Sequence, residues 1–164
     1  RLSLISFNGA ASSVSVDLGK PVISAEEKNI SFGGKQYTAN FVNVGNTHCV
    51  IFCDKVDEID IEALGQSLIE AEALPHGAYV ECVRVVNSLT VKMRVWEKEN
   101  GETLSCGTAA TAAVAVAAAK GLCRYGEVIT AKLKGGDLFV SCEENGNAVL
   151  DGSVKLSFKG SIEI

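Results

Sequence analysis

Proline, histidine and charged residues are all scarce in this chain, and each shortage narrows what the protein can be. Only 2 of its 164 residues are proline, and 47% are hydrophobic against 21% charged, which excludes a disordered chain. The longest uncharged apolar stretch, Ala109–Ala119, is far shorter than the roughly 20 residues that cross a bilayer. The net charge of −5 and the pI near 5.1 argue against a nucleic-acid partner, which requires a basic face.

Metal-ligand and secretion patterns are also missing. No C-x-x-C pair is present, and neither of the two histidines, His48 and His76, lies in a metal-ligand spacing. The sequence opens without the pattern of a signal peptide. Zinc and a disulfide framework are therefore the less favoured interpretations, and we expect reduced thiols in a cytoplasmic protein with no metal and no membrane contact. The six cysteines are Cys49, Cys53, Cys82, Cys106, Cys123 and Cys142.

Alternation of apolar and polar residues predicts that most of the chain forms strands. Turn dipeptides such as Asn100-Gly101 and Asp151-Gly152 separate the alternating segments. This spacing predicts an antiparallel, hairpin-rich sheet that curls or closes. The expected strands are Ser13–Leu18, Phe41–Val44, Cys49–Cys53, Val80–Val86, Leu89–Trp96, Val128–Leu133, Leu138–Cys142 and Val154–Phe158.

Two helices interrupt the predicted strands. The first is expected over Asp60–Ala73, with one apolar stripe and with Pro75 ending it, as in an ordinary surface helix. The second, Gly107–Ala119, has no charge, and eight of its thirteen residues are alanine. A helix that is apolar on every side must be enclosed on every side. We therefore predict one domain over residues 1–164, of the α+β class (an α/β roll), in which a strongly bent, mostly antiparallel sheet wraps a central buried apolar helix.

Cys106 stands where the N-cap of this second helix is expected, and only the ends of an enclosed helix can reach solvent. The unpaired N–H groups of a helix N-terminus carry partial positive charge, which favours a thiolate and can bind a carboxylate. Gly107 allows close approach to the backbone, and the N–H of Thr108 adds to the anion site. The alternative is a structural cysteine, which is how most buried free cysteines behave.

Three stretches resemble one protein family. Val44–Phe52 and Gly101–Ala109 are similar to the G-N-P-H-C-V and G-E-T-x-A-C-G-[ST]-G signatures of the C-terminal domain of diaminopimelate epimerases. Val16–Pro21 is similar to the V-D-M-G-x-P strand of the same family. The resemblance runs over nearly the whole chain, and it implies a racemase or epimerase that works without PLP or metal.

The resemblance also implies roles for particular residues. Cys106 would be one of two catalytic cysteines, of which one thiolate removes the Cα proton while the opposing thiol protonates the other face. Gly107 and Thr108 would hold the α-carboxylate through backbone N–H groups. Such N–H groups, in a pocket that excludes water, can stabilise the charge that develops as the proton leaves.

Three further residues take supporting roles in the family. Asn46 would hydrogen-bond the substrate, and His48 and Glu97 would lie beside the cysteines and tune their protonation, with Glu97 also in contact with the substrate. Each has a plainer interpretation as well: Asn46 as a turn residue, His48 as a structural histidine and Glu97 as a solvated charge at a strand end.

The chain departs from the family in two ways. The family's N-terminal domain, with the other cysteine in an N-G-N-x-x-R-C-like stretch, has no counterpart here. We therefore expect the C-terminal half of a two-domain epimerase, inactive alone, whose residues from about 156 to 164 form a closing strand against the missing domain. In the pocket, Tyr79 replaces an asparagine, and Lys98 replaces an arginine that would hold the distal carboxylate.

These departures leave the substrate open. Epimerisation of diaminopimelate from LL to meso is the leading prediction, with an amino acid as the small-molecule substrate and a homodimer as a possible assembly. A racemase of another amino acid on the same scaffold is the alternative that Tyr79 and Lys98 favour. A degenerate, non-catalytic binding domain is the third.

Overall fold

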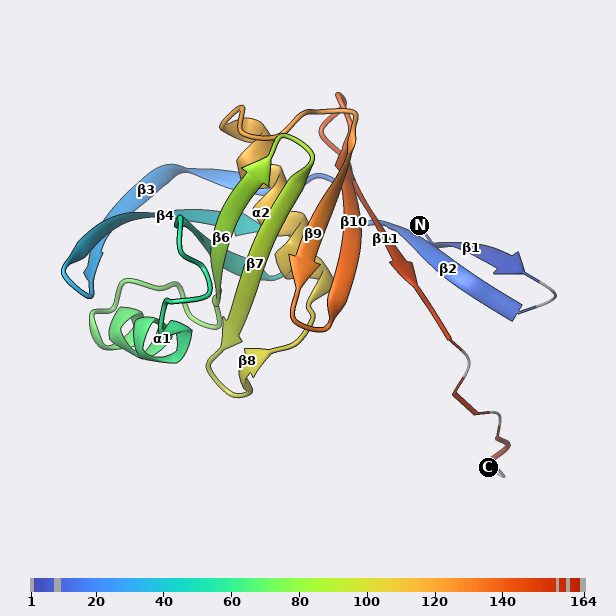
Figure 1. Ribbon diagram of the computed structural model, residues 1–164, viewed down its shortest axis with the longest axis horizontal. Coiled ribbons are helices and arrows are strands. Elements are labelled where there is room, and N and C mark those ends of the chain that lie inside the picture. The colour runs from blue at the N-terminus through green and yellow to red at the C-terminus, as the bar shows by residue number, and fades with distance from the viewer. Residues whose placement is uncertain (1, 8–9, 156, 159, 163–164) are drawn as a thin grey trace.

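The computed structural model describes residues 2–7, 10–155, 157–158 and 160–162, and it consists mostly of strands, with two helices (Figure 1). The helices are α1 (Ile61–Glu70) and α2 (Gly107–Ala119). The strands are β1 (Leu2–Phe7), β2 (Ala10–Asp17), β3 (Val22–Phe32), β4 (Lys35–Asn43), β5 (Thr47–Phe52), β6 (Tyr79–Asn87), β7 (Thr90–Glu97), β8 (Gly101–Thr103), β9 (Val128–Leu133), β10 (Gly136–Cys142) and β11 (Ala148–Ser153).

The strands form one mixed sheet in the order β1-β2-β11-β10-β9-β7-β6-β5-β4-β3, and β8 pairs with β7. Neighbouring strands are antiparallel except at two places, β5 beside β6 and β7 beside β9. Parallel neighbours require a crossover connection rather than a hairpin. The helices supply these crossovers, because α1 lies between β5 and β6 in the chain, and α2 follows β8 and precedes β9. The prediction of a mostly antiparallel sheet is confirmed, but hairpins alone do not build it.

Helix α2 is buried along most of its length. The ten residues from Ala109 to Ala118 are all buried, and the helix contacts strands on both sides of the sheet order, from β4 and β5 to β10 and β11. Alanine and valine on every face allow these strands to approach closely. The helix ends at Lys120, and Gly121, with φ of +70°, takes the left-handed conformation that glycine favours after a helix. In the described part of the chain, no helix is long and apolar enough to span a membrane.

Helix α1 packs on the sheet through one face and is shorter than the predicted Asp60–Ala73. Asp60 caps it by accepting a hydrogen bond from the Ala63 N–H at 3.0 Å. A methyl group added to Gly65 would lie 2.3 Å from a ring carbon of Trp96, so the helix and β7 meet closely. The helix ends at Glu70, before Pro75, because Glu72 adopts a left-handed φ of 51° that interrupts the helical hydrogen bonds.

One predicted strand is wrong, and four strands were not predicted. The chain forms no strand over the described residues of the predicted Val154–Phe158, since the last strand ends at Ser153. The strands without a counterpart among the predictions are β1, β3, β8 and β11. In β3, nine of the eleven residues, 22–29 and 31, are exposed at the edge of the sheet, where polar side chains are typical and obscure the alternation.

The predicted closing strand over residues 156–164 falls partly outside the described residues. Residues 156, 159 and 163–164 are not described, and residues 157–158 and 160–162 form no strand. Phe158 and Ile162 are 84% and 85% exposed, so they pack on nothing within the described chain. This tail leads away from β11 (Figure 1).

Candidate active site

Cys106 is the N-cap residue of α2, as the sequence predicts. Its backbone is extended, with φ of −148° and ψ of 116°, and its carbonyl accepts the first helical hydrogen bond from Ala110 at 3.0 Å. The half-buried thiol makes no capping hydrogen bond, and its sulfur lies 3.5 Å from the Thr108 hydroxyl oxygen. The first N–H groups of a helix have no intrahelical acceptor. The thiol and these N–H groups therefore share the same end of α2.

Gly107 lies close to a side chain of β11. A Cβ at this position would lie 2.6 Å from the Cδ2 atom of Leu150, on β11. The Gly107 carbonyl accepts a hydrogen bond from the Thr111 hydroxyl at 3.0 Å, which stabilises the first turn. The close approach to Leu150 seats the N-terminus of α2 firmly on the sheet.

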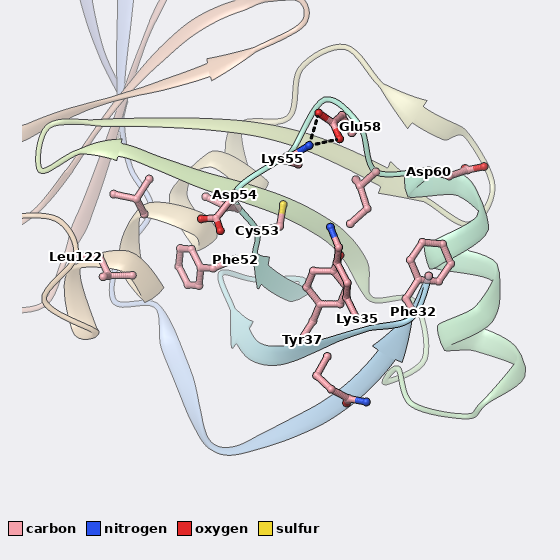
Figure 2. A pocket seen from close by; sticks show the side chains of 15 residues that line it. Phe32, Lys35, Tyr37, Phe52, Cys53, Asp54, Lys55, Glu58, Asp60 and Leu122 are labelled. Carbon is pink, nitrogen blue, oxygen red and sulfur yellow. Dashed lines mark hydrogen bonds and ion pairs between the residues drawn. The ribbon is translucent and has the colours of Figure 1, made fainter.

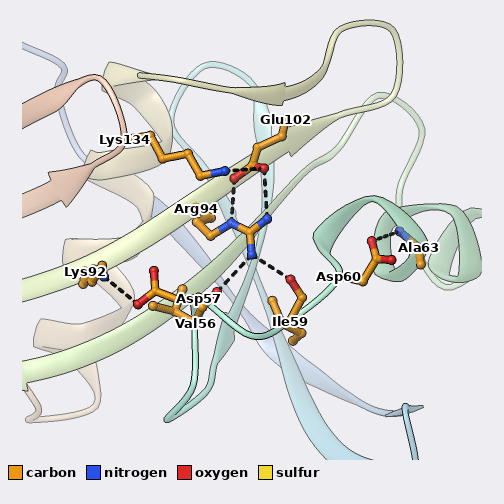
Figure 3. Close-up of polar contacts among 9 residues, drawn as sticks. All are labelled: Val56, Asp57, Ile59, Asp60, Ala63, Lys92, Arg94, Glu102 and Lys134. Carbon is orange, nitrogen blue, oxygen red and sulfur yellow. Dashed lines mark hydrogen bonds and ion pairs between the residues drawn. The ribbon is translucent and has the colours of Figure 1, made fainter.

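Glu102 anchors the loop that delivers Cys106 (Figure 3). Its carboxylate accepts hydrogen bonds from Arg94 Nε at 2.6 Å and Nη2 at 2.9 Å, and from Lys134 at 2.8 Å. These partners hold the pKa of Glu102 at about 2. Arg94 also donates to the carbonyl oxygens of Val56 and Ile59, at 3.2 and 2.6 Å. The Glu102 side chain thereby ties β8 to β7 and to the loop before α1.

A backbone hydrogen bond fixes the same loop from its other side. The Gly135 N–H donates to the carbonyl of Leu104 at 2.7 Å. A Cβ at Gly135 would lie 2.9 Å from that carbonyl oxygen, so glycine permits the approach. With Glu102 and Leu104 both held, the two residues before Cys106 have little freedom.

A fully buried His48 lies on β5, between two polar partners. Its Nδ1 atom is 2.6 Å from Glu81 Oε1, and its Nε2 atom is 3.1 Å from Asn46 Oδ1. The amide oxygen of Asn46 only accepts, so Nε2 carries a proton. The ring therefore links a buried carboxyl group on β6 to the asparagine in the loop between β4 and β5.

Glu81 is the residue of this cluster that sequence analysis missed. Burial raises its pKa, and the hydrogen bond from His48 opposes that rise. Its Oε2 atom has no hydrogen-bond partner among the described residues. The Glu81 carboxyl group and the His48 ring therefore form a fully buried hydrogen-bonded pair. A lone acid in the valine-rich segment Val80–Val86 was the one available signal in the sequence.

Tyr79 connects this cluster to a cavity of about 460 Å³. It lies directly opposite His48 in the parallel β5–β6 pairing, and the two rings meet edge to face at 5.3 Å. The pKa of Tyr79 is raised first by the negative charge of Glu97, then by burial and by Cys106. The same cavity is lined by Glu97, the last residue of β7, and by the exposed Lys98. Glu97 accepts a hydrogen bond from the Asn100 side chain at 2.7 Å.

The predicted site residues thus fall into three neighbouring groups. Asn46 and His48 are joined by a hydrogen bond, Cys106 and Thr108 adjoin at the end of α2, and Glu97 and Lys98 line the cavity beside Tyr79. In the described part of the chain, no three His, Cys, Asp or Glu side chains converge as a metal site would require. A second cavity of about 840 Å³ contains none of the predicted site residues (Figure 2).

Solved structures define the class of protein through the fold. A probable proline racemase from Agrobacterium radiobacter K84 superposes with a TM-score of 0.70 at 14% identity, covering 97% of this chain and 57% of that one. A predicted epimerase from Pseudomonas aeruginosa gives a TM-score of 0.67 at 17% identity, covering 96% and 63%. The architecture is therefore one that racemases and epimerases use.

Sequence comparison narrows the class to a family. The family model for diaminopimelate epimerase matches residues 40–157, a range that contains every predicted site residue. The diaminopimelate epimerase of Methanococcus maripaludis strain C5 is 36% identical over 170 residues, which cover 96% of this chain and 61% of that protein. That of Bacillus mycoides strain KBAB4 is 33% identical, covering 90% and 56%. The chain belongs to the diaminopimelate epimerase family, and it spans about 60% of the length of these relatives.

Proposed function

We propose that the complete protein inverts the Cα centre of an amino acid without PLP or a metal, and that diaminopimelate, converted from LL to meso, is its substrate. The observation that carries this proposal is the Cys106 thiol at the N-terminus of buried α2, inside the segment that matches the family. The curated relatives whose sequences match this segment are diaminopimelate epimerases.

Cys106 acts as one of two bases on opposite faces of the substrate. As thiolate it takes the Cα proton, and a second thiol on the other face returns a proton, so that the configuration inverts. The electron pair left at Cα spreads into the α-carboxylate. The N–H groups of Gly107 and Thr108 bind that carboxylate, where aligned dipoles stabilise the added negative charge.

Asn46 presents a defined side of its amide to the substrate. Its Oδ1 atom is engaged by His48 Nε2, so the Nδ2 group is the part that remains to donate toward a substrate oxygen. The Glu81 carboxyl fixes the ring from behind through Nδ1. His48 therefore orients Asn46 and places a titratable group behind the substrate site.

Glu97 and Lys98 serve the other parts of the substrate. Glu97 lies in the cavity near the Tyr79 phenol, where its negative charge suits an ammonium group of the substrate. Lys98 offers one positive charge to a distal carboxylate. A racemase of a different amino acid is the second candidate function, which Tyr79 in the cavity wall specifically favours because it narrows the space for the distal end.

The chain acts as one half of a two-domain protein. Support comes from its coverage of about 60% of the curated relatives, which leaves room for a further domain with the second cysteine. Helix α2 is the central axis of this half, supported by its buried residues and its contacts with strands at both ends of the sheet order. The exposed Phe158 and Ile162 suit a tail that packs on the other half. A homodimer is a compatible assembly.

Deuterium incorporation at Cα from heavy water tests this function. The chain alone is expected to leave diaminopimelate unlabelled, and addition of the N-terminal half is expected to start exchange. In the complete protein, Cys106→Ser should lower kcat for epimerisation drastically, because inversion needs a base on each face. The matched control, Cys123→Ser, should not lower kcat in this way, because Cys123 lies beyond the other end of α2. Rapid exchange by this chain alone, or equal loss in both variants, would contradict the two-cysteine mechanism.

A further inference from the structure

Two thiols outside the candidate active site lie on neighbouring strands, and one of them lines the larger cavity. Cys53 directly follows β5, and its N–H donates to the Val83 carbonyl at 2.8 Å, which holds it against β6. Cys82 lies on β6, opposite Ile51 in the parallel register. Residues two apart on a strand share a face, so Cys53 is on the same side of the sheet as Ile51 and Cys82. Both thiols belong to one hydrophobic cluster.

The two thiols differ in access. Cys82 is completely buried, whereas Cys53 is half-buried and lines the cavity of about 840 Å³, where Figure 2 shows it among the lining side chains. Lys35 and Lys55 line the same cavity. A small polar oxidant can therefore reach the sulfur of Cys53. The buried sulfur of Cys82 can then be oxidised only by reaction with Cys53.

The two thiols also differ in the direction of their pKa shifts. The hydrogen bond from Cys82 lowers the pKa of Cys53, against the opposing effects of burial and Asp54. The same contact, together with burial, raises the pKa of Cys82. By contrast, burial raises the pKa of Cys49, Cys123 and Cys142. Thiols that react with peroxide are accessible, favour the thiolate and lie next to a second thiol.

We propose that Cys53 is a peroxide-reactive thiol and that Cys82 resolves its oxidised form as a disulfide. In the first step the Cys53 thiolate attacks the terminal oxygen of a hydroperoxide. The S–O bond forms, the O–O bond breaks, and the leaving oxygen takes a proton to become water or an alcohol. In the second step the Cys82 sulfur attacks the sulfenic acid, the S–S bond forms, and the hydroxyl leaves as water with the Cys82 proton. Two thiols lose two electrons, and the peroxide gains them.

The bond requires a local movement of Cys53. By register Cys53 is the diagonal neighbour of Cys82, and Cα atoms in such a pair are roughly 7–8 Å apart, at or beyond the limit of about 7 Å for a disulfide. Cys53 is the first residue after β5, and loss of its backbone hydrogen bond to the Val83 carbonyl would let it approach Cys82 while the rest of the β5–β6 pairing stays intact. The bond would tie together the two strands that carry His48 and Glu81.

Thiol mapping by mass spectrometry tests the proposal. The reduced chain with Cys106→Ser, which silences the other half-buried thiol, is treated with hydrogen peroxide at neutral pH, and the remaining thiols are then alkylated. We expect a peptide linked through Cys53 and Cys82, with the Cys53 thiol consumed at least about tenfold faster than that of Cys123. Cys123 and Cys142 form the matched control pair. They are close enough for one to raise the pKa of the other, but both are buried, and they should stay reduced.

A variant separates the two steps. Cys82→Ala, checked for folding by circular dichroism, should leave Cys53 as a sulfenic acid that dimedone captures. The proposal is overturned if Cys53 reacts no faster than Cys123, if wild-type Cys53 proceeds to sulfinic acid without a disulfide, or if Cys53 pairs with another cysteine. Mapping of the Cys53–Cys82 disulfide does not depend on this variant. The proposal can therefore still be tested if Cys82→Ala fails to fold.

Discussion

Glu81 shows how much a single buried side chain can control at the residue scale. Its carboxyl group accepts hydrogen bonds from the His48 ring and the Cys49 backbone, and the side chain is fully buried. Through His48 it reaches Asn46, in a different loop. A change that preserves its shape but removes its ionisation therefore tests orientation and protonation separately from packing.

We expect Glu81→Gln in the complete protein to lower kcat by about tenfold or more and to change the pH profile of kcat, because the ionisable carboxyl group that orients the His48 ring is lost. The free energy of unfolding, by contrast, should not decrease in this variant. The pKa of Glu81 is raised in the folded state, so its ionisation costs stability as pH rises, and glutamine removes that cost. Chemical denaturation at pH 8 should thus find the variant no less stable than wild type.

The exposed Glu70 provides the control for this substitution. Glu70→Gln at the end of α1 should alter neither kcat nor the pH profile. An unchanged pH profile in Glu81→Gln as well would show that Glu81 is a structural residue only.

The sequence located some site residues and not others for a physical reason. Asn46 and His48 stand in one contiguous motif, and Cys106 and Thr108 stand in another. Chain connectivity alone therefore places the two members of each pair near one another. Glu81 is 33 residues from its partner His48, and their contact depends on the register of two parallel strands. No local pattern encodes that register, so the pair could not be recognised before the structure.

At the scale of elements, the three-residue strand β8 depends on one ion-pair cluster. Glu102 is 17% exposed and accepts from both Arg94 and Lys134. We expect Glu102→Gln to lower the free energy of unfolding at pH 7 by about 2 kcal/mol. The control, Glu58→Gln, removes an exposed pair with Lys55 and should cost about 0.5 kcal/mol or less.

The pH dependence follows from the direction of the shift. The pKa of Glu102 falls from 4.5 to about 2 on folding, so its stabilisation is complete above pH 4.5 and is lost as pH falls through about 2. Urea titrations between pH 5 and pH 2 should show a shallower loss of stability in Glu102→Gln than in wild type. Parallel curves would mean that the cluster contributes nothing to folding.

Elements of uniform character were the most predictable. Helix α2 begins and ends where its alanine-rich composition does, at Gly107 and Ala119. The end of α1 was misplaced because the left-handed Glu72, not Pro75, interrupts it. Strand β3 was missed because an edge strand with exposed Glu26, Glu27 and Lys28 lacks the apolar alternation of an inner strand.

At the scale of the whole molecule, the proposed function assigns the choice of amino acid to the cavity beside Tyr79. A lost charge-assisted hydrogen bond costs roughly 1.5–3 kcal/mol, or about 10- to 150-fold in affinity. We therefore expect Tyr79→Asn combined with Lys98→Arg to raise kcat/KM for diaminopimelate at least about fivefold. Lys92→Arg, at a pair with Asp57 outside this cavity, is the control and should have no effect.

A decrease in kcat/KM in the double variant would have the opposite meaning. The phenol and the ammonium group would then be suited to diaminopimelate as they stand. The case for a racemase of another amino acid would disappear with that result, and diaminopimelate epimerase would remain as the single interpretation.

The pairing of β2 with β11 has a consequence for the rate at which the chain folds. Asp17 lies opposite Val149, so this pairing, near one end of the sheet order, joins segments from nearly opposite ends of the described chain. Closing so long a loop costs entropy before any contact compensates for it, and such topologies fold in milliseconds to seconds. Stopped-flow fluorescence can follow this, since Trp96 is the one tryptophan in the sequence and is buried against α1. Refolding within microseconds would show that Trp96 reports a local α1–β7 unit that forms before β2 and β11 meet.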